Sequence, residues 1–440
     1  MKNKFIKSTL ILVIGGFFTK LLGLVIRIVL TRLIGTNGIG MYSMISPTFL
    51  LLNSIAMMGL PTALNVLISS DKYNNKNLVA TSIFVSLSID IIIMIILLLS
   101  YNYLSVNLLN NPKLSLGILS IGFVLPFITV SNCFRSYYFA KQRMYPHVIS
   151  NIIEDVIRLI LIIIGVPFFL KKGIEYCIAF ILLTNIFSEL SSIIIFIVLF
   201  PKFKCTKIDL KPNKKNIFEL FKIGIPTTGS RLIGSVGYFL EPIIITYVLI
   251  NIGYSNTFIV NEYGVINGYV MQLVLLPSFF TLAISQALIP IVSKNYTKRN
   301  YKYIKKKMHQ AIFFSLLIGI PVTIIFELFP EFLLNLFFKT DKGINYIRVL
   351  APICLFHYIQ SPISSTLQAM KKAKLSLKGT LYGMIIRTIS LFFISYLSIG
   401  LWSLIIATSV NIIFVTGYDY IKVKQELKNK HTQKTSKITC

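Results

Sequence analysis

The chain has 440 residues, of which 55% are hydrophobic and 13% are charged. A soluble protein of this size carries about 25% charged residues, so the composition excludes an ordinary soluble enzyme and indicates helices that lie in lipid. The formal net charge of +29 would suit a nucleic-acid-binding protein, but the positions of the basic residues along the chain argue for a different origin of this charge.

The apolar residues form twelve runs of about 20 residues or more, the length that spans a bilayer as a helix. The first run follows Lys2, Lys4 and Lys7, and we interpret it as a retained helix because no small-residue cleavage site follows it. The sequence therefore predicts an all-α polytopic membrane protein with about twelve transmembrane helices. The expected spans are residues 8–32, 41–69, 78–101, 115–138, 147–170, 174–200, 218–250, 263–293, 309–330, 343–370, 376–398 and 400–421.

The basic residues between these spans gather on one side of the expected membrane. The two termini and the even-numbered connections hold 30 of the 44 lysines and arginines, and the odd-numbered connections hold six. By the positive-inside rule, both termini are expected in the cytoplasm. The charge is then a topology signal and a surface that faces anionic membrane lipids, and no nucleic-acid partner is expected.

The twelve spans divide into two equal groups at a basic stretch. We expect an N-terminal six-helix bundle at residues 1–200, a cytoplasmic basic linker at 201–217, a C-terminal six-helix bundle at 218–425 and a cytoplasmic polar tail at 426–440. Residues 63–69 and 287–293 resemble each other and end the second span of each half. Transporters built from two such repeats bind substrate between the halves and alternate the access to it.

Four spans contain a glycine two residues before a proline, with the glycines at Gly59, Gly165, Gly224 and Gly319. A proline removes a backbone donor and kinks a helix. These positions are either hinges of a moving transporter or static bends, which membrane helices tolerate.

Several charged residues fall inside the expected spans, where a charge costs at least ~2.5 kcal/mol on insertion scales. Lys20 and Arg27 are seven residues apart and share a helix face. If the two halves are repeats, Lys20, Arg27 and Arg231 give the central cavity a cationic wall, suited to an anionic ligand such as a pyrophosphate. Glu241 is then a counter-charge to Arg27 or a site for a coupling cation or proton. The alternative is that these charges only pair and lock helices together.

A second polar cluster lies in the fifth span. Glu154, Asp155 and Arg158 have spacings of three and four residues, so they can pair on one helix. We therefore favour a structural role for this cluster over a functional one.

Two regions resemble a known family. Residues 19–27 (TKLLGLVIR) and 31–35 (TRLIG) are similar to the opening of bacterial peptidoglycan-precursor flippases, although Lys20 stands where that family often has arginine. Residues 229–242 and 275–285 resemble the stage V sporulation protein B family of the multidrug/oligosaccharidyl-lipid/polysaccharide exporter superfamily. The resemblance implies a V-shaped pair of six-helix bundles, as in MATE transporters, and substrate-binding roles for Lys20, Arg27 and Arg231 with Glu241 beside them.

The expected function is a flippase that moves a lipid-linked oligosaccharide, a peptidoglycan or spore-cortex precursor or another polysaccharide, across the cytoplasmic membrane. Its expected partners are the lipid-linked glycan, anionic lipids and the cell-wall synthesis machinery. The alternative is a cation-coupled multidrug exporter of the same superfamily, which Glu241 favours. A membrane-embedded enzyme is disfavoured because acidic catalytic pairs and a sizeable external domain are missing from the sequence. No cofactor or metal is expected, and without a G-x-x-x-x-G-K-[ST] motif the energy comes from Na⁺, H⁺, the membrane potential or the substrate gradient.

Overall fold

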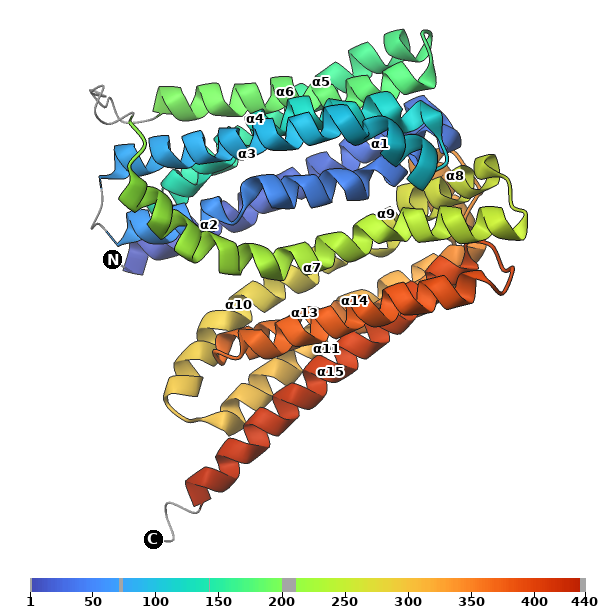
Figure 1. Ribbon diagram of the computed structural model, residues 1–440. Coiled ribbons are helices and arrows are strands. Elements are labelled where there is room, and N and C mark those ends of the chain that lie inside the picture. The colour runs from blue at the N-terminus through green and yellow to red at the C-terminus, as the bar shows by residue number, and fades with distance from the viewer. Residues whose placement is uncertain (1, 71–73, 142, 200–210, 436–440) are drawn as a thin grey trace. The chain divides into compact units, whose positions relative to one another are not determined.

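The computed structural model describes residues 2–70, 74–141, 143–199 and 211–435. These ranges form helices joined by short turns, with no strand among them (Figure 1). Their contacts group the chain into two compact units. The first is Met1–Tyr247 with Asn256–Gly264, and the second is Val248–Ser255 with Val265–Cys440.

The first unit is a set of long helices that pack side by side. Helix α4 contacts α2, α3 and α6, while α5 contacts α6 and α1. An apolar core joins α2, α3, α4, α6 and α7, and includes Leu64, Tyr138, Phe196 and Leu220. The elements are α1 (Lys2–Met57), α2 (Leu60–Ser69), α3 (Asn75–Tyr103), η1 (Leu104–Leu108), η2 (Pro112–Leu114), α4 (Ser115–Ala140), α5 (Met144–Leu170), α6 (Ile174–Leu199), α7 (Lys214–Ile252) and α8 (Asn256–Gly264).

The second unit is organised around α13, which contacts α10, α11 and α15, while α14 packs on α15. Its core includes Leu288, Ile304, Met308, Leu367 and Val423 from these helices. The elements are η3 (Val265–Val270), α9 (Met271–Val274), α10 (Ser278–Thr297), α11 (Tyr301–Leu328), α12 (Pro330–Phe338), α13 (Ile344–Ala369), α14 (Ala373–Ser395) and α15 (Trp402–Thr435).

The long element α1 is two helices that meet at Gly35, whose φ of 67° and ψ of −173° are not helical. Glycine adopts this positive φ without the steric cost that a side chain would impose. A second interruption separates α1 from α2 at Gly59, with φ 65°. The break predicted at Gly59-Leu60-Pro61 is therefore confirmed. Because α1 runs from the first predicted span into the second, these two spans are joined without a loop.

The other three glycine–proline pairs do not interrupt their helices. Pro167, Pro226 and Pro321 lie inside α5, α7 and α11, which continue past them. An interruption that the sequence did not predict separates α9 from α10, and the two parts of that span meet at an angle of 50°. Pro277 lies at this break, where its missing N–H cannot continue the backbone ladder.

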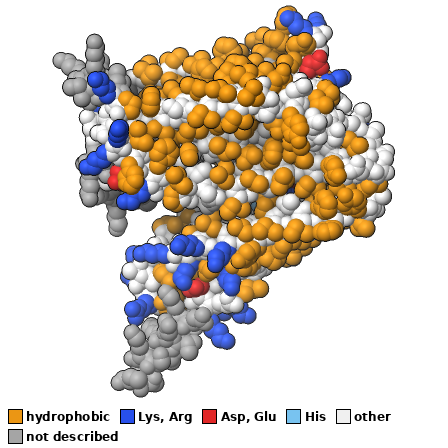
Figure 2. Space-filling model, viewed as in Figure 1, with side chains coloured by type: hydrophobic (Ala, Val, Ile, Leu, Met, Phe, Trp, Pro, Cys, Tyr) orange, Lys and Arg blue, Asp and Glu red, His pale blue; other side chains and the backbone are white. Residues whose placement is uncertain are grey.

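All twelve predicted spans overlap helices, and the all-α polytopic membrane fold is confirmed. Within the described ranges, seven helices are long and apolar enough to cross a membrane by themselves, and the bent pair around Pro277 would make eight. Large apolar side chains such as Leu99 (84% exposed) and Val198 (74% exposed) point away from the protein. Hydrophobic side chains cover most of the visible sides of the helices, while lysines and arginines gather toward the helix ends (Figure 2). The number of twelve spans and the cytoplasmic termini stay predictions.

The grouping by contacts differs from the predicted boundary at residue 218. Most of α7 belongs to the first unit, because Asn216 donates to Asn77 at 2.7 Å and Ser235 hydrogen-bonds to Ser54 at 2.9 Å. Residues 201–210 of the predicted linker lie outside the described residues. The predicted tail at 426–440 is helical through Thr435 as the end of α15, and the division into two six-helix bundles stays a prediction.

Candidate functional site

The guanidinium of Arg27 is the best defined of the predicted cationic groups. Its Nη2 donates to the Ser43 hydroxyl at 3.1 Å, and its Cζ lies 5.3 Å from the centre of the Tyr42 ring. A straight helix of 16 residues would separate Arg27 from Ser43 by about 24 Å. The contact therefore requires the change of direction at Gly35, and Arg27 ties together the two parts of α1.

The two other predicted cations are not seen next to Arg27. Lys20 is exposed on α1, about two turns before Arg27. Arg231 is part of α7, but its side chain lies outside the described part of the structure. The cationic wall formed by Lys20, Arg27 and Arg231 therefore stays a prediction.

The predicted counter-charge Glu241 is buried on α7, with 3% of its surface exposed. Its Oε1 accepts a hydrogen bond of 2.8 Å from the hydroxyl of Tyr263, which lies on α8 and is 1% exposed. The segment between them turns at Gly253, where φ is 106°. Tyr263 thus fixes the direction of the carboxylate inside the first unit.

The charged cluster on α5 includes more residues than the sequence indicated. Arg158 pairs with Glu154 at 2.7 Å and with Asp155 at 3.4 Å, the local pairs that their spacing predicts. Arg135 of α4 pairs with Glu154 as well, and with Glu189 of α6 at 3.0 Å. The result is a network of two arginines and three carboxylates that links three helices of the first unit.

Sequence reasoning did not single out Arg135 and Glu189, although both fall inside predicted spans. A charge at bilayer depth is rare and pairs with another, so their presence in 115–138 and 174–200 was a usable signal. With every group ionised, the network carries one net negative charge. It can hold α4, α5 and α6 together, and its excess carboxylate could also bind a small cation or a proton.

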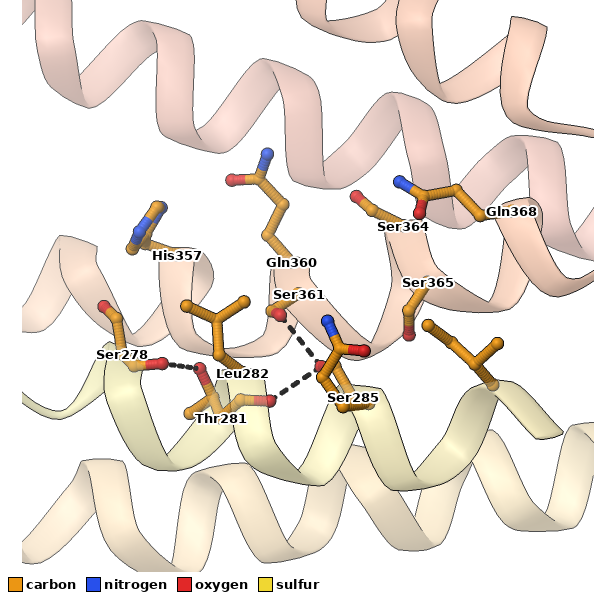
Figure 3. A pocket seen from close by; sticks show the side chains of 12 residues that line it. Ser278, Thr281, Leu282, Ser285, His357, Gln360, Ser361, Ser364, Ser365 and Gln368 are labelled. Atoms are coloured by element: carbon orange, nitrogen blue, oxygen red, sulfur yellow. Dashed lines mark hydrogen bonds between the residues drawn. The ribbon is translucent and has the colours of Figure 1, made fainter. Parts of the chain in front are cut away.

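A cavity of about 290 Å³ lies in the second unit between α10 and α13 (Figure 3). Its lining side chains repeat every three or four residues, which is the spacing of one helix face. Helix α10 contributes Ser278, Thr281, Leu282, Ser285, Gln286 and Ile289.

The facing helix carries the more polar half of the lining. Helix α13 contributes His357, Gln360, Ser361, Ser364, Ser365 and Gln368. The hydroxyls of Ser285 and Ser361 hydrogen-bond across the two helices at 2.8 Å. Behind this wall, Ser364 donates to the carboxylate of Asp419 on α15, which is 0% exposed. The polar stripe in the predicted span 343–370 was visible in the sequence, but only the packing reveals the cavity.

Comparison with known proteins agrees with the fold and with the resemblance noted in the sequence. The profile of the family described as "Polysaccharide biosynthesis protein" matches residues 5–296, and that of the MatE family matches residues 242–394. Over 427 residues the chain is 31% identical to Stage V sporulation protein B of Bacillus subtilis (strain 168). This alignment covers 94% of this chain and 82% of that protein.

Two further similarities extend over nearly the whole chain. The chain is 22% identical over 463 residues to Lipid II flippase MurJ of Bacillus subtilis (strain 168), covering 97% of this chain and 83% of that protein. The solved structure of a multidrug resistance MATE family transporter of the MOP superfamily, in an inward-facing conformation, aligns with a TM-score of 0.79 and 16% identity over 94% of this chain and 96% of that chain. The chain therefore belongs to the polysaccharide biosynthesis protein family and has the fold of the MATE transporter.

Proposed function

We propose that this protein is a flippase that moves a lipid-linked oligosaccharide, a peptidoglycan or spore-cortex precursor or another polysaccharide precursor, across the cytoplasmic membrane by alternating access. The observation that carries the proposal is the 31% identity to Stage V sporulation protein B along 94% of this chain. The likeness to Lipid II flippase MurJ supports a lipid-linked substrate.

The chemistry of Arg27 supports an anionic substrate. A guanidinium is always charged and its planar fork binds phosphate oxygens in pairs. Arg27 is half-buried, and its guanidinium contacts the Ser43 hydroxyl and the Tyr42 ring. A lipid-linked glycan with a phosphate or pyrophosphate group between lipid and sugar would offer such a group the oxygens that it binds best.

A cation-coupled multidrug exporter is the second candidate. Buried carboxylates such as Glu241 and Asp90, which are 3% and 0% exposed, could bind the coupling cation or proton that such an exporter needs. The fold does not separate the two functions, since the MATE transporter shares it.

The proposal can be tested in bacterial cells depleted of their own flippases. Charge reversal by Arg27→Glu or Arg231→Glu should abolish translocation of the lipid-linked precursor while the variant remains in the membrane. Arg348→Glu is the matched control, because Arg348 is an exposed arginine of α13. It should translocate as the wild type does.

Full translocation by both charge-reversal variants would contradict an anion-binding role of these arginines. The exporter function would then be tested by dye efflux from cells that carry the wild type or Glu241→Gln. Efflux by the wild type and its loss in Glu241→Gln would favour the multidrug exporter.

A further inference from the structure

Most of the side chains that line the cavity between α10 and α13 carry a polar group. Ten of its twelve lining residues are serine, threonine, glutamine or histidine, and none is aspartate, glutamate, lysine or arginine. Ligand pockets are commonly lined by apolar side chains with a small number of polar groups. A lining of hydroxyls and amides without charge suits a ligand that is itself uncharged and carries many hydroxyl groups.

The polar groups of the lining are only partly satisfied by one another. Ser285 and Ser361 share a hydrogen bond, and the Thr281 hydroxyl donates to the Ser278 carbonyl (Figure 3). The Ser278 hydroxyl is buried without a hydrogen-bond partner among the described residues. An unsatisfied buried hydroxyl costs free energy that a bound ligand or water would recover.

The helix behind the cavity directs one of its hydroxyls. Ser364 gives its proton to the buried carboxylate of Asp419. The Ser364 oxygen therefore faces any ligand as an acceptor, while the glutamine amides beside it offer both donors and acceptors. A sugar hydroxyl also donates and accepts, so it can satisfy both kinds of group at once.

The cavity is a half-open hollow of modest volume. The 290 Å³ lies at the lower end of the range of ligand pockets, about 300–1,000 Å³, and corresponds to about ten waters at ~30 Å³ each. Leu282, Ile289 and the carbon atoms of the polar side chains also give the lining an apolar surface, which suits the C–H face of a sugar ring. A lipid chain would leave the polar lining unpaired, and a charged group would find no aspartate, glutamate, lysine or arginine among the lining residues as a counter-charge.

We propose that this cavity binds one uncharged sugar ring, and, resting on the proposed function, that this ring belongs to the glycan of the lipid-linked substrate. The cavity then recognises the sugar part of the substrate.

The test uses the purified full-length protein in detergent and three free sugars: uncharged N-acetylglucosamine, cationic glucosamine and anionic glucuronate. Saturation-transfer NMR measures the binding of each. The variant Gln286→Leu/Gln360→Leu removes one amide from each wall at nearly constant side-chain size. Gln310→Leu is the matched control, since Gln310 is an exposed residue of α11 that does not line the cavity.

The wild type and Gln310→Leu should show saturation transfer to N-acetylglucosamine. The double variant should bind this sugar with an affinity reduced by about tenfold, because hydrogen bonds are lost. The two charged sugars should bind more weakly than the uncharged one. The proposal would be overturned by equal affinity in the wild type and the double variant, or by a preference for a charged sugar. It would also be overturned if no saturation transfer to the uncharged sugar is seen, as expected if the cavity holds only water.

This outcome is distinguishable from failure of the flippase function itself. Precursor translocation by a wild type that binds no sugar would overturn the cavity proposal alone. Sugar binding that depends on Gln286 and Gln360 in a protein that moves no precursor would support the cavity and contradict the flippase.

Discussion

Arg135 of α4 and Glu189 of α6 form an ion pair of 3.0 Å although they are 54 residues apart in the chain. Their side chains are 17% and 5% exposed, so the pair is largely removed from solvent. Arg135 also pairs with Glu154 of α5. One guanidinium thus pairs with carboxylates from two neighbouring helices.

Removing this guanidinium should destabilise the first unit strongly. The substitution Arg135→Leu leaves three carboxylates with Arg158 as their one arginine. Removing one partner of a buried ion pair lowers the free energy of unfolding by roughly 3–5 kcal/mol. The midpoint of thermal unfolding in detergent, followed by size-exclusion chromatography, measures the loss. Arg143→Leu, at an exposed position just before α5, is the control and should melt like the wild type.

The double variant Arg135→Leu/Glu189→Leu sharpens this test. It removes a carboxylate together with its partner, so it should be less destabilised than Arg135→Leu alone. A single variant that melts at the wild-type temperature would mean that the network does not hold the helices together.

The crossing of α2 and α7 should not tolerate a side chain. A Cβ at Gly224 would lie 2.7 Å from the carbonyl oxygen of Met58, and one at Gly59 would lie 2.3 Å from the carbonyl oxygen of Gly224. Overpacking of this kind costs roughly 1–3 kcal/mol. Gly224→Ala should therefore lower the melting midpoint. Gly229→Ala lies on the same helix with no atom within 4 Å, and it should have no such effect; equal midpoints for both variants would show that the crossing is not tight.

The buried carboxylate of Asp90 should depend on its hydroxyl partner. The Thr129 hydroxyl donates to Asp90 at 2.6 Å, and Asp90 is 0% exposed. Thr129→Val leaves the carboxylate without this donor and should cost about 1–3 kcal/mol. Thr388→Val is the control, because that hydroxyl bonds only to its own helix, at Met384. A loss of stability in Thr388→Val equal to that in Thr129→Val would argue against the role of the α3–α4 contact.

Local spacing predicted part of this structure well. The break at Gly59 followed from a glycine and a proline two residues apart, and the pairs of Arg158 followed from helix geometry. The break before Ser278 was missed because Pro277 has no glycine two residues before it. Local signals of this kind predict where a helix can bend, but neighbouring helices decide where it does.

Contacts between distant segments could not be predicted in the same way. Arg135 and Glu189 were each visible as a charge inside an apolar span, but their pairing requires that α4 and α6 lie together. The spacing of the polar residues from His357 to Gln368 places them on one helix face. That this face lines a cavity follows only from the position of α10 opposite it. The predicted site at Lys20 and Arg27 rests on their shared helix face and on a family resemblance, and the structure adds two contacts of Arg27.

The most direct test of the central claim is translocation by the purified protein in liposomes that contain a fluorescently labelled lipid-linked oligosaccharide precursor. A membrane-impermeant reagent that quenches the label on the outer leaflet measures how much precursor crosses. The account predicts that the wild type exchanges the precursor between leaflets and that Arg27→Glu, incorporated at equal density, does not. The contradicting result has two parts: with the wild type, the precursor remains in its original leaflet, and the same preparation exports a cationic dye from liposomes. This result would establish the drug exporter instead.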